Sequence, residues 1–224
     1  MKDMQLLIYC AGGLGKEILH EAEAVNKTES RWQKISFVDD VCSEDCWNGY
    51  HIYKYDEALK LKAKDDVEVI IANGEPCVRE KLWDKLQKDA FSMATIIHPT
   101  CSVSPYAKIG KGVVIEERCG ISPNVVIGDN VHMQANAILG HDVELGAHSV
   151  VSSFCGIGGG CRIGVRCFFG MSSTIKQDIT IGDDVITAIG AAVFRNAKKG
   201  KILLGNPAKS IGDNSGSVFH MFDA

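Results

Sequence analysis

The sequence lacks the features that would place it on nucleic acid or in a membrane. Its 224 residues carry a net charge of −4, and no stretch is dense in lysine or arginine. Nucleic acid, which attracts basic patches, is therefore not an expected partner. The apolar run near the start spans only Leu6 to Tyr9, which is too short for a signal peptide or a membrane span. We expect a cytoplasmic protein.

A paired arrangement of cysteines that would hold zinc is also missing. Cys42 and Cys46 are separated by three residues, and no second pair matches them. The chain has nine cysteines, and five of them fall at small-residue positions of the repeat described next, where cysteine acts as a small buried hydrophobe. We therefore expect reduced thiols, with neither a disulfide framework nor a metal.

The sequence has instead a period of six residues. Every sixth position from Val103 to Val193 is apolar at fifteen of sixteen sites, without an insertion, although only 46% of the chain is hydrophobic. The sixteen are Val103, Ile109, Ile115, Ile121, Ile127, Met133, Leu139, Leu145, Val151, Ile157, Ile163, Phe169, Ile175, Ile181, Thr187 and Val193. A period of six fits neither an α-helix nor a flat strand and is typical of a parallel β-helix.

Two further ladders run beside the apolar one. Small or β-branched residues stand two positions before it, and glycine often stands one position after it. The cysteines of the first ladder are Cys101, Cys119, Cys155, Cys161 and Cys167, and the glycines of the second are Gly110, Gly128, Gly140, Gly146, Gly158, Gly164, Gly170 and Gly182. We expect these glycines to supply positive φ at the corners of the coil. Three strands and three corners give about eighteen residues per coil and a little over five coils.

The first 95 residues or so alternate between strand and helix patterns, which implies a small parallel sheet. Strands are predicted at 4–10, 35–38, 49–53, 67–72 and 94–97, and helices at 17–25, 56–64 and 76–88. The fold class is thus α/β followed by a β-solenoid. We expect a first domain over 1–98, a β-helix over 99–211 and a C-terminal tail over 212–224, with loose, polar chain from Ser210 onward.

The first strand leads into a glycine-rich turn and then a helix. Such a turn places backbone N–H groups and a helix N-terminus against a phosphate. Asp39 and Asp40 end the second strand, where a carboxylate can accept hydrogen bonds from a ribose or a base. Neither feature is specific, because the glycines do not match the dinucleotide fingerprint and both segments also fit ordinary turns.

Three histidines, His132, His141 and His148, lie outside the interior ladders, so each is expected to point outward or lie at a corner. For any one alone, an ordinary surface histidine is the simpler interpretation. His141 stands out because Asp142 follows it, and an imidazole beside a carboxylate is a ready general base. A shared metal is not expected, because the spacings place the three on different corners or faces.

Several motifs together resemble one enzyme family. These are the hexad ladder, the corner at 140–142, the terminal segment 205–209, and the N-terminal segments 9–17, 38–40 and 97–99. The combination, over about residues 4–211, resembles the NeuD/PglD-type sugar O- and N-acetyltransferases. The resemblance implies a Rossmann-like N-terminal domain that binds a sugar nucleotide, and a left-handed β-helix. It also implies a homotrimer with acetyl-CoA between adjacent β-helices and no metal.

The activity implied is acetyl-CoA-dependent N-acetylation of a nucleotide-linked 4-amino-4,6-dideoxy sugar, in polysaccharide or glycan biosynthesis. The alternative is O-acetylation of a sialic-acid-type sugar, and a non-catalytic β-helical binding module ranks lower. Some family members have histidine at the positions of Leu14 and Val150, so the sugar itself is not implied.

The resemblance also implies roles for single residues. His141 corresponds to the general base and Asp142 to the acid that orients it, while a backbone N–H such as that of Gly159 would stabilise the oxyanion. The implied substrate-binding residues are Gly12, Gly13, Leu14, Gly15, Lys16, Asp39, Asp40, Asn73 and Gly74. The implied acetyl-CoA residues are Gln134, Val150, Gly159, Met171, Ala188, Ile189, Gly190 and Lys209.

Overall fold

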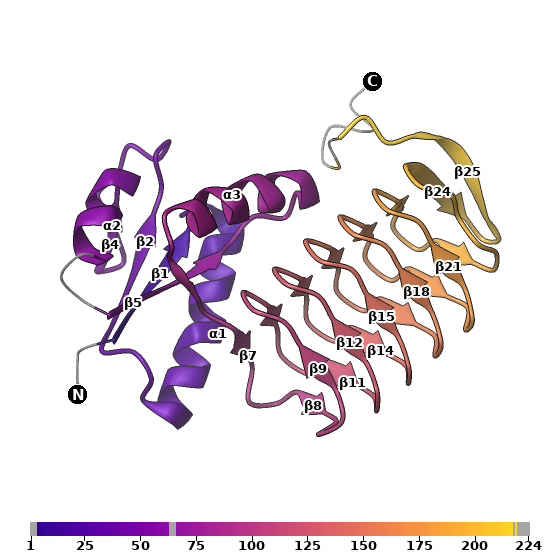
Figure 1. Ribbon diagram of the computed structural model, residues 1–224, viewed down its shortest axis with the longest axis horizontal. Helices are drawn as coiled ribbons and strands as arrows, with labels where there is room; N and C mark the ends of the chain where they lie inside the picture. Colours follow the sequence, from indigo (N-terminus) through magenta and orange to yellow (C-terminus); the bar gives the residue numbers. More distant parts are fainter. Residues whose placement is uncertain (1–3, 63–65, 217, 219–224) are drawn as a thin grey trace.

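The N-terminal part of the chain forms an α/β unit around one sheet (Figure 1). The computed structural model describes residues 4–62, 66–216 and 218. The strand order is β3-β4-β2-β1-β5-β6, and every pair is parallel except β3 with β4. The strands are β1 (Met4–Tyr9), β2 (Lys34–Val38), β3 (Cys46–Trp47), β4 (Tyr50–Tyr53), β5 (Asp66–Ile71) and β6 (Ser92–Met93). The predicted parallel sheet is confirmed.

Helices cover both faces of this sheet. Successive residues of a strand point to opposite faces, and apolar residues occur on both, so each face packs against helices. The helices are α1 (Gly13–Glu29), α2 (Tyr55–Lys62) and α3 (Pro76–Lys88). Leu6 and Ile8 of β1 pack on the side of α1, and Leu7 and Tyr9 pack on the side of α2 and α3. The unit is Rossmann-like, with crossover helices on both faces of a parallel sheet.

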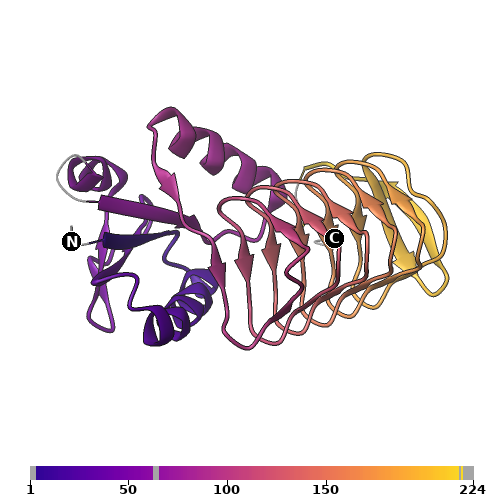
Figure 2. The same cartoon turned by 60° about the horizontal axis from the view of Figure 1, so that its bottom comes forward.

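From β7 onward the chain winds into a left-handed parallel β-helix, whose stacked coils are seen in Figure 2. Each coil adds one short strand to each of three sheets, which we call the first, second and third faces. Residues eighteen positions apart pair between coils, as Ile121 does with Val103 and Leu139.

The three faces consist of two-residue strands, apart from a longer pair at the C-terminal end of the first face. The first face contains β7 (Ile96–Ile97), β10 (Val114–Ile115), β13 (His132–Met133), β16 (Val150–Val151), β19 (Phe168–Phe169), β22 (Ile186–Thr187), β24 (Lys201–Gly205) and β25 (Ala208–Asp213). The second contains β8 (Ser102–Val103), β11 (Gly120–Ile121), β14 (Ile138–Leu139), β17 (Gly156–Ile157), β20 (Thr174–Ile175) and β23 (Ala192–Val193). The third contains β9 (Lys108–Ile109), β12 (Val126–Ile127), β15 (Glu144–Leu145), β18 (Arg162–Ile163) and β21 (Thr180–Ile181).

The predicted six-residue ladder forms the core of the β-helix. Ile115, Met133 and Phe169 are fully buried in one cluster with the small residues that precede the ladder. The ladder cysteines belong to or pack against this cluster, and the cysteines of the described chain are free thiols. The prediction that these cysteines act as small buried hydrophobes is confirmed for Cys119, Cys155, Cys161 and Cys167, whereas Cys101 in the first coil is only partly buried.

The recurrent glycines serve a different purpose from the one predicted, because none of them has positive φ. They stand where neighbouring coils touch, and a Cβ at Gly146 would lie 2.3 Å from the carbonyl oxygen of Gly164. Positive φ falls two residues after these glycines, at residues such as Asn130, Asp142 and His148. Asparagine tolerates this left-handed conformation, so the corner itself does not require glycine.

Two predictions at the ends of the β-helix are wrong. The strand expected at 94–97 does not extend the N-terminal sheet, because Ile96–Ile97 pairs with β10 and begins the first face. The edge strand of the N-terminal sheet is β6, just before it. Residues 210–213 are not loose chain, because they belong to β25, which pairs antiparallel with β24. This hairpin covers the edge of the first face, which would otherwise be left unpaired.

The two halves meet through α1. Ile96 and Val114 of the first face belong to the same buried cluster as Ile18 and Leu19 of α1. Glu21 lies in this junction and is only 5% exposed. Burial, together with the nearby carboxylates of Glu116 and Glu117, raises the pKa of Glu21 from 4.5 to about 8.

Glu21 is therefore expected to make stability depend on pH. The folded chain holds a proton on Glu21 that the unfolded chain releases above its pKa of 4.5, so this stabilisation is lost as pH rises toward about 8. Glu21→Gln should flatten the pH dependence of Tm between pH 5 and 9 and raise Tm at pH 9 by about 2–4 °C. The exposed Glu17→Gln on the same helix is the control for thermal melts. Identical pH profiles for Glu21→Gln and the unmodified protein would contradict this assignment.

Candidate functional site

A cavity of about 580 Å³ opens between the N-terminal sheet and the first face of the β-helix. The chain leaves β1, β2 and β5 at the same edge of the parallel sheet, which is the edge where α/β folds bind ligands. The lining residues are Cys10, Gly12, Gly13, Leu14, Glu17, Asp39, Val41, Ala72, Asn73, Gly74, Glu75, His132, Gln134, Val150, Ser152 and Phe168. Six predicted substrate-binding residues are among them.

The glycine turn forms one wall of this cavity. Gly12 and Gly13 are exposed, and a Cβ at either would meet no atom within 4 Å. Helix α1 begins at Gly13 with no side-chain cap and no acidic residue in its first turn. Its first N–H groups are therefore open to an anion such as a phosphate. Gly15 is buried, and its role is packing, because a Cβ there would lie 2.1 Å from the carbonyl oxygen of Cys10.

Asp39 holds this wall together. Its carboxylate accepts hydrogen bonds from the backbone N–H groups of Ala11 at 2.9 Å, Val41 at 2.8 Å and Cys42 at 2.9 Å. Burial raises the pKa of Asp39, but these three bonds and the charge of Lys54 outweigh burial and lower it overall. Asp39 therefore acts as an ionised acceptor that orders the glycine turn and the segment after β2.

Asp40 and Lys16 are not among the residues that line the cavity. Asp40 accepts a hydrogen bond from the backbone N–H of Tyr55 at 2.9 Å, which places it at the start of α2, and it lies 3.5 Å from Nζ of Lys85. Consecutive residues at a strand end face opposite sides of the sheet, so only one of the two acids reaches the cavity. Lys16 lies over the ring of Trp47, with Nζ 4.7 Å from the ring centroid.

Asn73 and Gly74 form the rim after β5, and Arg79 supports them from behind. The guanidinium of Arg79 is fully buried, and Nη1 donates to the carbonyl oxygens of Ile71 at 3.1 Å and Asn73 at 2.9 Å. Nε and Nη2 donate to the carbonyl oxygen of Asn130 at 3.0 and 2.9 Å, and Nη2 also donates to its side-chain oxygen at 2.8 Å. Arg79 thus joins the cavity rim to a corner of the β-helix.

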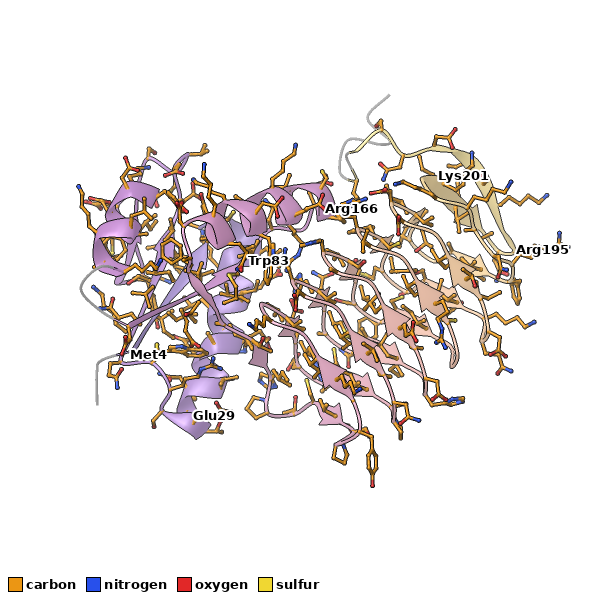
Figure 3. All side chains as sticks on the ribbon, in the orientation of Figure 1. Met4, Glu29, Trp83, Arg166, Arg195 and Lys201 are labelled. Atoms are coloured by element: carbon orange, nitrogen blue, oxygen red, sulfur yellow. The ribbon has the colours of Figure 1, made fainter. Side chains whose placement is uncertain are left out.

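All the acceptors of Arg79 are neutral oxygens, and within the described ranges of the chain it has no carboxylate partner. Burial lowers the pKa of Arg79 to about 9. The junction continues to His148, whose Nδ1 lies 3.0 Å from the Asn130 amide nitrogen and whose ring meets the ring of Trp83 edge-on. Trp83 is labelled in Figure 3. His148 is therefore part of the junction between α3 and the β-helix, at a corner as predicted.

Two residues predicted to bind acetyl-CoA, Gln134 and Val150, also line this cavity. They come from the first face, so they lie opposite the glycine turn. The cavity therefore has one wall of open backbone N–H groups from the N-terminal unit and an opposite wall from the β-helix.

His141 and Asp142 lie at a corner between the second and third faces. His141 Nδ1 is 2.7 Å from Oδ2 of Asp142, and the amide of Asn124 donates to Oδ1 at 2.9 Å. The bond with His141, and then the one from Asn124, lower the pKa of Asp142, so it is ionised at neutral pH. The predicted pairing of the imidazole with the carboxylate is present.

This pairing leaves the other edge of the imidazole open. The Asp142 carboxylate places the proton on Nδ1, so Nε2 carries the lone pair. The side chain of His141 is 72% exposed. Gly159 of the next coil lies beside the ring, and a Cβ there would come within 2.7 Å of Nε2. Glycine at this position thus leaves room for the imidazole.

The cavity and the histidine corner do not meet within one chain. The cavity lies against the first face, whereas His141 lies on the opposite edge of the triangular coil, between the other two faces. No residue of the corner at 140–142 is among the cavity lining.

The remaining residues predicted for acetyl-CoA fall into two groups. Met171, Ala188, Ile189 and Gly190 form one patch where the first face turns into the second, and the N–H of Gly190 donates to Met171 O at 2.9 Å. Lys209 lies on β25 at the far end of the β-helix. It borders a hollow lined by three further cationic side chains whose role was not predicted from the sequence. Two of them, Arg195 and Lys201, are labelled at this end in Figure 3. These cations are Arg195, Lys198 and Lys201.

His132 is a further cavity residue whose place was not predicted. It points outward as expected, yet it is fully buried, with Nε2 2.6 Å from Oε1 of Glu116. Stepping through the sequence by eighteen residues would have revealed it, since it is the polar member of an otherwise apolar row.

Neither a metal site nor a membrane segment is found in the portion of the chain described. No group of three or more His, Cys, Asp or Glu side chains is placed to hold an ion in residues 4–62, 66–216 and 218. Among the helices of the same residues, none has the length and apolar character needed to cross a membrane.

Two family models match consecutive parts of the chain. The model described as the PglD N-terminal domain matches residues 5–86, and the model described as the GMPPB C-terminal domain matches residues 91–202, half of the chain.

Solved structures of acetyltransferases are similar over almost the whole chain. The acetyltransferase domain of PglB from Neisseria gonorrhoeae FA1090, in complex with acetyl coenzyme A, is 27% identical with a TM-score of 0.87, covering 93% of this chain and 100% of that one. A histidine-to-asparagine variant of perosamine N-acetyltransferase from Caulobacter crescentus, in complex with CoA and GDP-perosamine, is 27% identical with a TM-score of 0.86, covering 93% and 97%. WeeI from Acinetobacter baumannii AYE is 26% identical with a TM-score of 0.73, covering 93% and 100%.

Curated relatives match over shorter spans. Bifunctional protein GlmU from Streptococcus mutans is 27% identical over 159 residues, which are 66% of this chain and 35% of that protein. UDP-3-O-acylglucosamine N-acyltransferase from Bordetella pertussis is 37% identical over 62 residues, which are 28% of this chain and 17% of that protein. The matches thus span about a third or less of these relatives.

The buried junction at Arg79 predicts a large loss of stability on substitution. Arg79→Met should lower the free energy of unfolding by about 3–5 kcal/mol, because it leaves the carbonyl oxygens of Ile71, Asn73 and Asn130 buried without donors. Urea denaturation measures this, with the exposed Arg118→Met as the control, expected within about 0.5 kcal/mol of the unmodified protein. Equal effects of the two substitutions would contradict the role given to Arg79.

Proposed function

We propose a specific reaction for this chain, which belongs to the NeuD/PglD-type sugar acetyltransferases: it transfers the acetyl group of acetyl-CoA to the amino group of a nucleotide-linked 4-amino-4,6-dideoxy sugar. The observation that carries the proposal is the His141–Asp142 pair. Its carboxylate lies 2.7 Å from Nδ1 and leaves Nε2 open at an exposed corner.

In the proposed mechanism His141 acts as the general base. The sugar amine attacks the thioester carbonyl carbon, and Nε2 takes a proton from the nitrogen as the C–N bond forms. The tetrahedral intermediate then expels the CoA thiolate, which receives the proton from His141. Asp142 stabilises the imidazolium that exists between these steps, and its lowered pKa keeps it ionised. The N–H of Gly159, beside the ring, is the candidate donor to the oxyanion.

The cavity at the glycine turn is the proposed site of the sugar nucleotide. The open N–H groups of Gly12, Gly13 and the first turn of α1 suit a diphosphate. Leu14, Asn73 and Gly74 complete the wall, and Asp39 orders it. The similarity to a perosamine N-acetyltransferase solved with GDP-perosamine supports an amino sugar as the acceptor.

Acetyl-CoA is proposed to lie along the edge formed by Met171 and Ile189, which are 47% and 70% exposed. Its phosphates would then meet the basic end of the β-helix near Lys209 and Arg195. A PglB acetyltransferase domain of similar structure was solved with acetyl-CoA.

A complete site requires a second chain, so we place it between subunits of a homotrimer. The cavity and His141 lie on opposite sides of one β-helix, and a neighbouring copy can bring its His141 to the cavity. Exposed apolar side chains along the second face and its edges are available to bury in such an assembly. They include Ile138, Phe154, Met171 and Ile189.

The reaction is tested by thiol release from acetyl-CoA against a panel of UDP-, dTDP- and GDP-linked sugars, each with an amino or a hydroxyl group at the reacting position. The proposal expects turnover with an amino sugar nucleotide. Turnover restricted to hydroxyl acceptors would establish O-acetylation instead, and no turnover, together with no CoA binding by calorimetry, would point to a binding module.

His141→Ala is expected to lower kcat by about 10²–10⁴-fold because the general base is lost. CoA affinity measured by calorimetry should stay within about twofold, since binding does not use the Nε2 lone pair. The exposed His20→Ala is the matched control and should keep full activity. Full activity of His141→Ala would refute the mechanism.

A mixing experiment tests the shared site. Gly13→Phe should fill the cavity without disturbing the fold, because a Cβ at this position meets no atom within 4 Å. This variant and His141→Ala should each be inactive alone. Refolded together in equal amounts, they should recover about a quarter of the unmodified activity, because a random pair of neighbours combines an intact cavity with an intact His141 one time in four. Absence of any recovery would place both parts of the site in one chain.

A further inference from the structure

A buried histidine interrupts an otherwise apolar row on the first face. Residues that follow one another by eighteen positions stack in this row and point away from the core of the β-helix. The row is Ile96, Val114, His132, Val150, Phe168 and Ile186. His132 is fully buried in it, between Val114 and Val150. Burying an imidazole where an aliphatic side chain would pack well costs free energy unless both ring nitrogens are hydrogen-bonded.

Glu116 orients this histidine. Oε1 of Glu116 lies 2.6 Å from Nε2 of His132, and Oε2 accepts a hydrogen bond from the backbone N–H of Ala135 at 2.9 Å. Both carboxylate oxygens thus have fixed partners, so the carboxylate cannot turn away. A carboxylate at this distance requires a proton on Nε2, which makes Nδ1 the acceptor atom of the ring.

Nδ1 of His132 has no partner. Within residues 4–62, 66–216 and 218 no donor reaches it, and the atom is buried. An unsatisfied polar atom in such a place destabilises a fold, because it loses its hydration without gaining a hydrogen bond. Histidines in protein cores usually form hydrogen bonds through both nitrogens. The open Nδ1 therefore lacks a hydrogen-bond donor, which the described residues do not supply.

We look to a ligand in the cavity for the donor that Nδ1 of His132 lacks. His132 lines it, together with Gln134 and Ser152 of the same wall, whereas Glu116 does not. His132, and not Glu116, is therefore the member of the pair that borders the cavity. This wall faces the glycine turn, so a diphosphate bound at α1 would direct the rest of a ligand toward the β-helix and His132.

We propose that His132 is a specificity-determining residue whose Nδ1 accepts a hydrogen bond from a ring hydroxyl of the sugar, and that Glu116 is the positioning residue that keeps this nitrogen an acceptor. The inference rests on the proposed function, since it assumes that a sugar nucleotide occupies the cavity. A hydroxyl fits better than the amine, because the amine must reach His141 of the neighbouring subunit.

Two substitutions of His132 separate this role from a purely structural one. His132→Asn places an amide oxygen where Nδ1 was and loses the contact with Glu116, whereas His132→Gln reaches Glu116 and loses the acceptor at Nδ1. If His132 binds the sugar, the asparagine variant keeps affinity for the sugar nucleotide and the glutamine variant loses about 10- to 100-fold. If the pair only ties neighbouring coils together, the glutamine variant is the better of the two in both affinity and Tm.

Glu116→Gln tests the positioning role. The glutamine carbonyl must accept from the Ala135 N–H, so its NH₂ group faces Nε2 and forces the ring proton onto Nδ1. This turns the acceptor into a donor without removing a side chain. Nitrogen-15 NMR of the histidine rings should show protonated Nε2 in the unmodified protein and protonated Nδ1 in Glu116→Gln, together with a similar 10- to 100-fold loss of affinity.

Calorimetry with the whole chain tests the role of His132 by measuring affinities for two kinds of probe. These are UDP-, dTDP- and GDP-linked 4-amino-4,6-dideoxy sugars, and the free nucleotides UDP, dTDP and GDP. The proposal expects the variants to bind the free nucleotide as the unmodified protein does and to differ only for the sugar nucleotide. Equal affinities of all variants for the sugar nucleotide, or a proton on Nδ1 in the unmodified protein, would overturn it. If the unmodified protein binds neither kind of probe, the proposed function fails instead.

Discussion

Close contact between stacked coils limits where a functional site can lie on this β-helix. Each coil rests on the next so tightly that a Cβ at Gly140 would lie 2.5 Å from the backbone nitrogen of Gly159. No insertion interrupts the register, so no long loop leaves the β-helix to fold over a site. Chemistry on the β-helix is therefore limited to side chains and backbone N–H groups on the outer faces and corners of the coil. The two histidines proposed to act here fit this constraint. His141 pairs with the adjacent Asp142 at a corner, and His132 on the first face pairs with Glu116 one coil away.

The N-terminal unit supplies what the β-helix does not, which is a helix start whose open backbone N–H groups suit the proposed diphosphate. Its position on the β-helix is fixed by the apolar packing of α1 and by Arg79, whose guanidinium spans the cavity rim and Asn130. A buried cation without a carboxylate is tolerable here because five hydrogen bonds to neutral oxygens replace its hydration. The cavity thus lies between two units joined by apolar packing and buried hydrogen bonds, and its shape depends on this junction.

Much of this could be predicted from the sequence because the β-helix is a local repeat: a period of six identifies the core, explains the cysteines and locates the His141–Asp142 corner. The errors came where pairing is not local. Ile96–Ile97 looks like any strand of the N-terminal unit, and only its pairing with β10 shows where it belongs. The recurrent glycines are required by close contact with backbone atoms one coil away, so turn preferences could not reveal their role. Arg79 acquires its partners only when distant segments meet, and nothing near it in sequence signals this. His132 stands out only as the polar member of a row with a spacing of eighteen residues, and its contact with Glu116 is visible only in the folded chain.

The central claim is that one chain holds the sugar nucleotide and a neighbouring chain provides the base. A crystal structure of the protein with CoA and its accepted sugar nucleotide measures this most directly. The sugar amino group should lie within hydrogen-bonding distance of Nε2 of a neighbouring subunit's His141, with the diphosphate at the glycine turn of the first chain. A sugar bound far from every copy of His141, or a diphosphate bound away from the glycine turn, would contradict it.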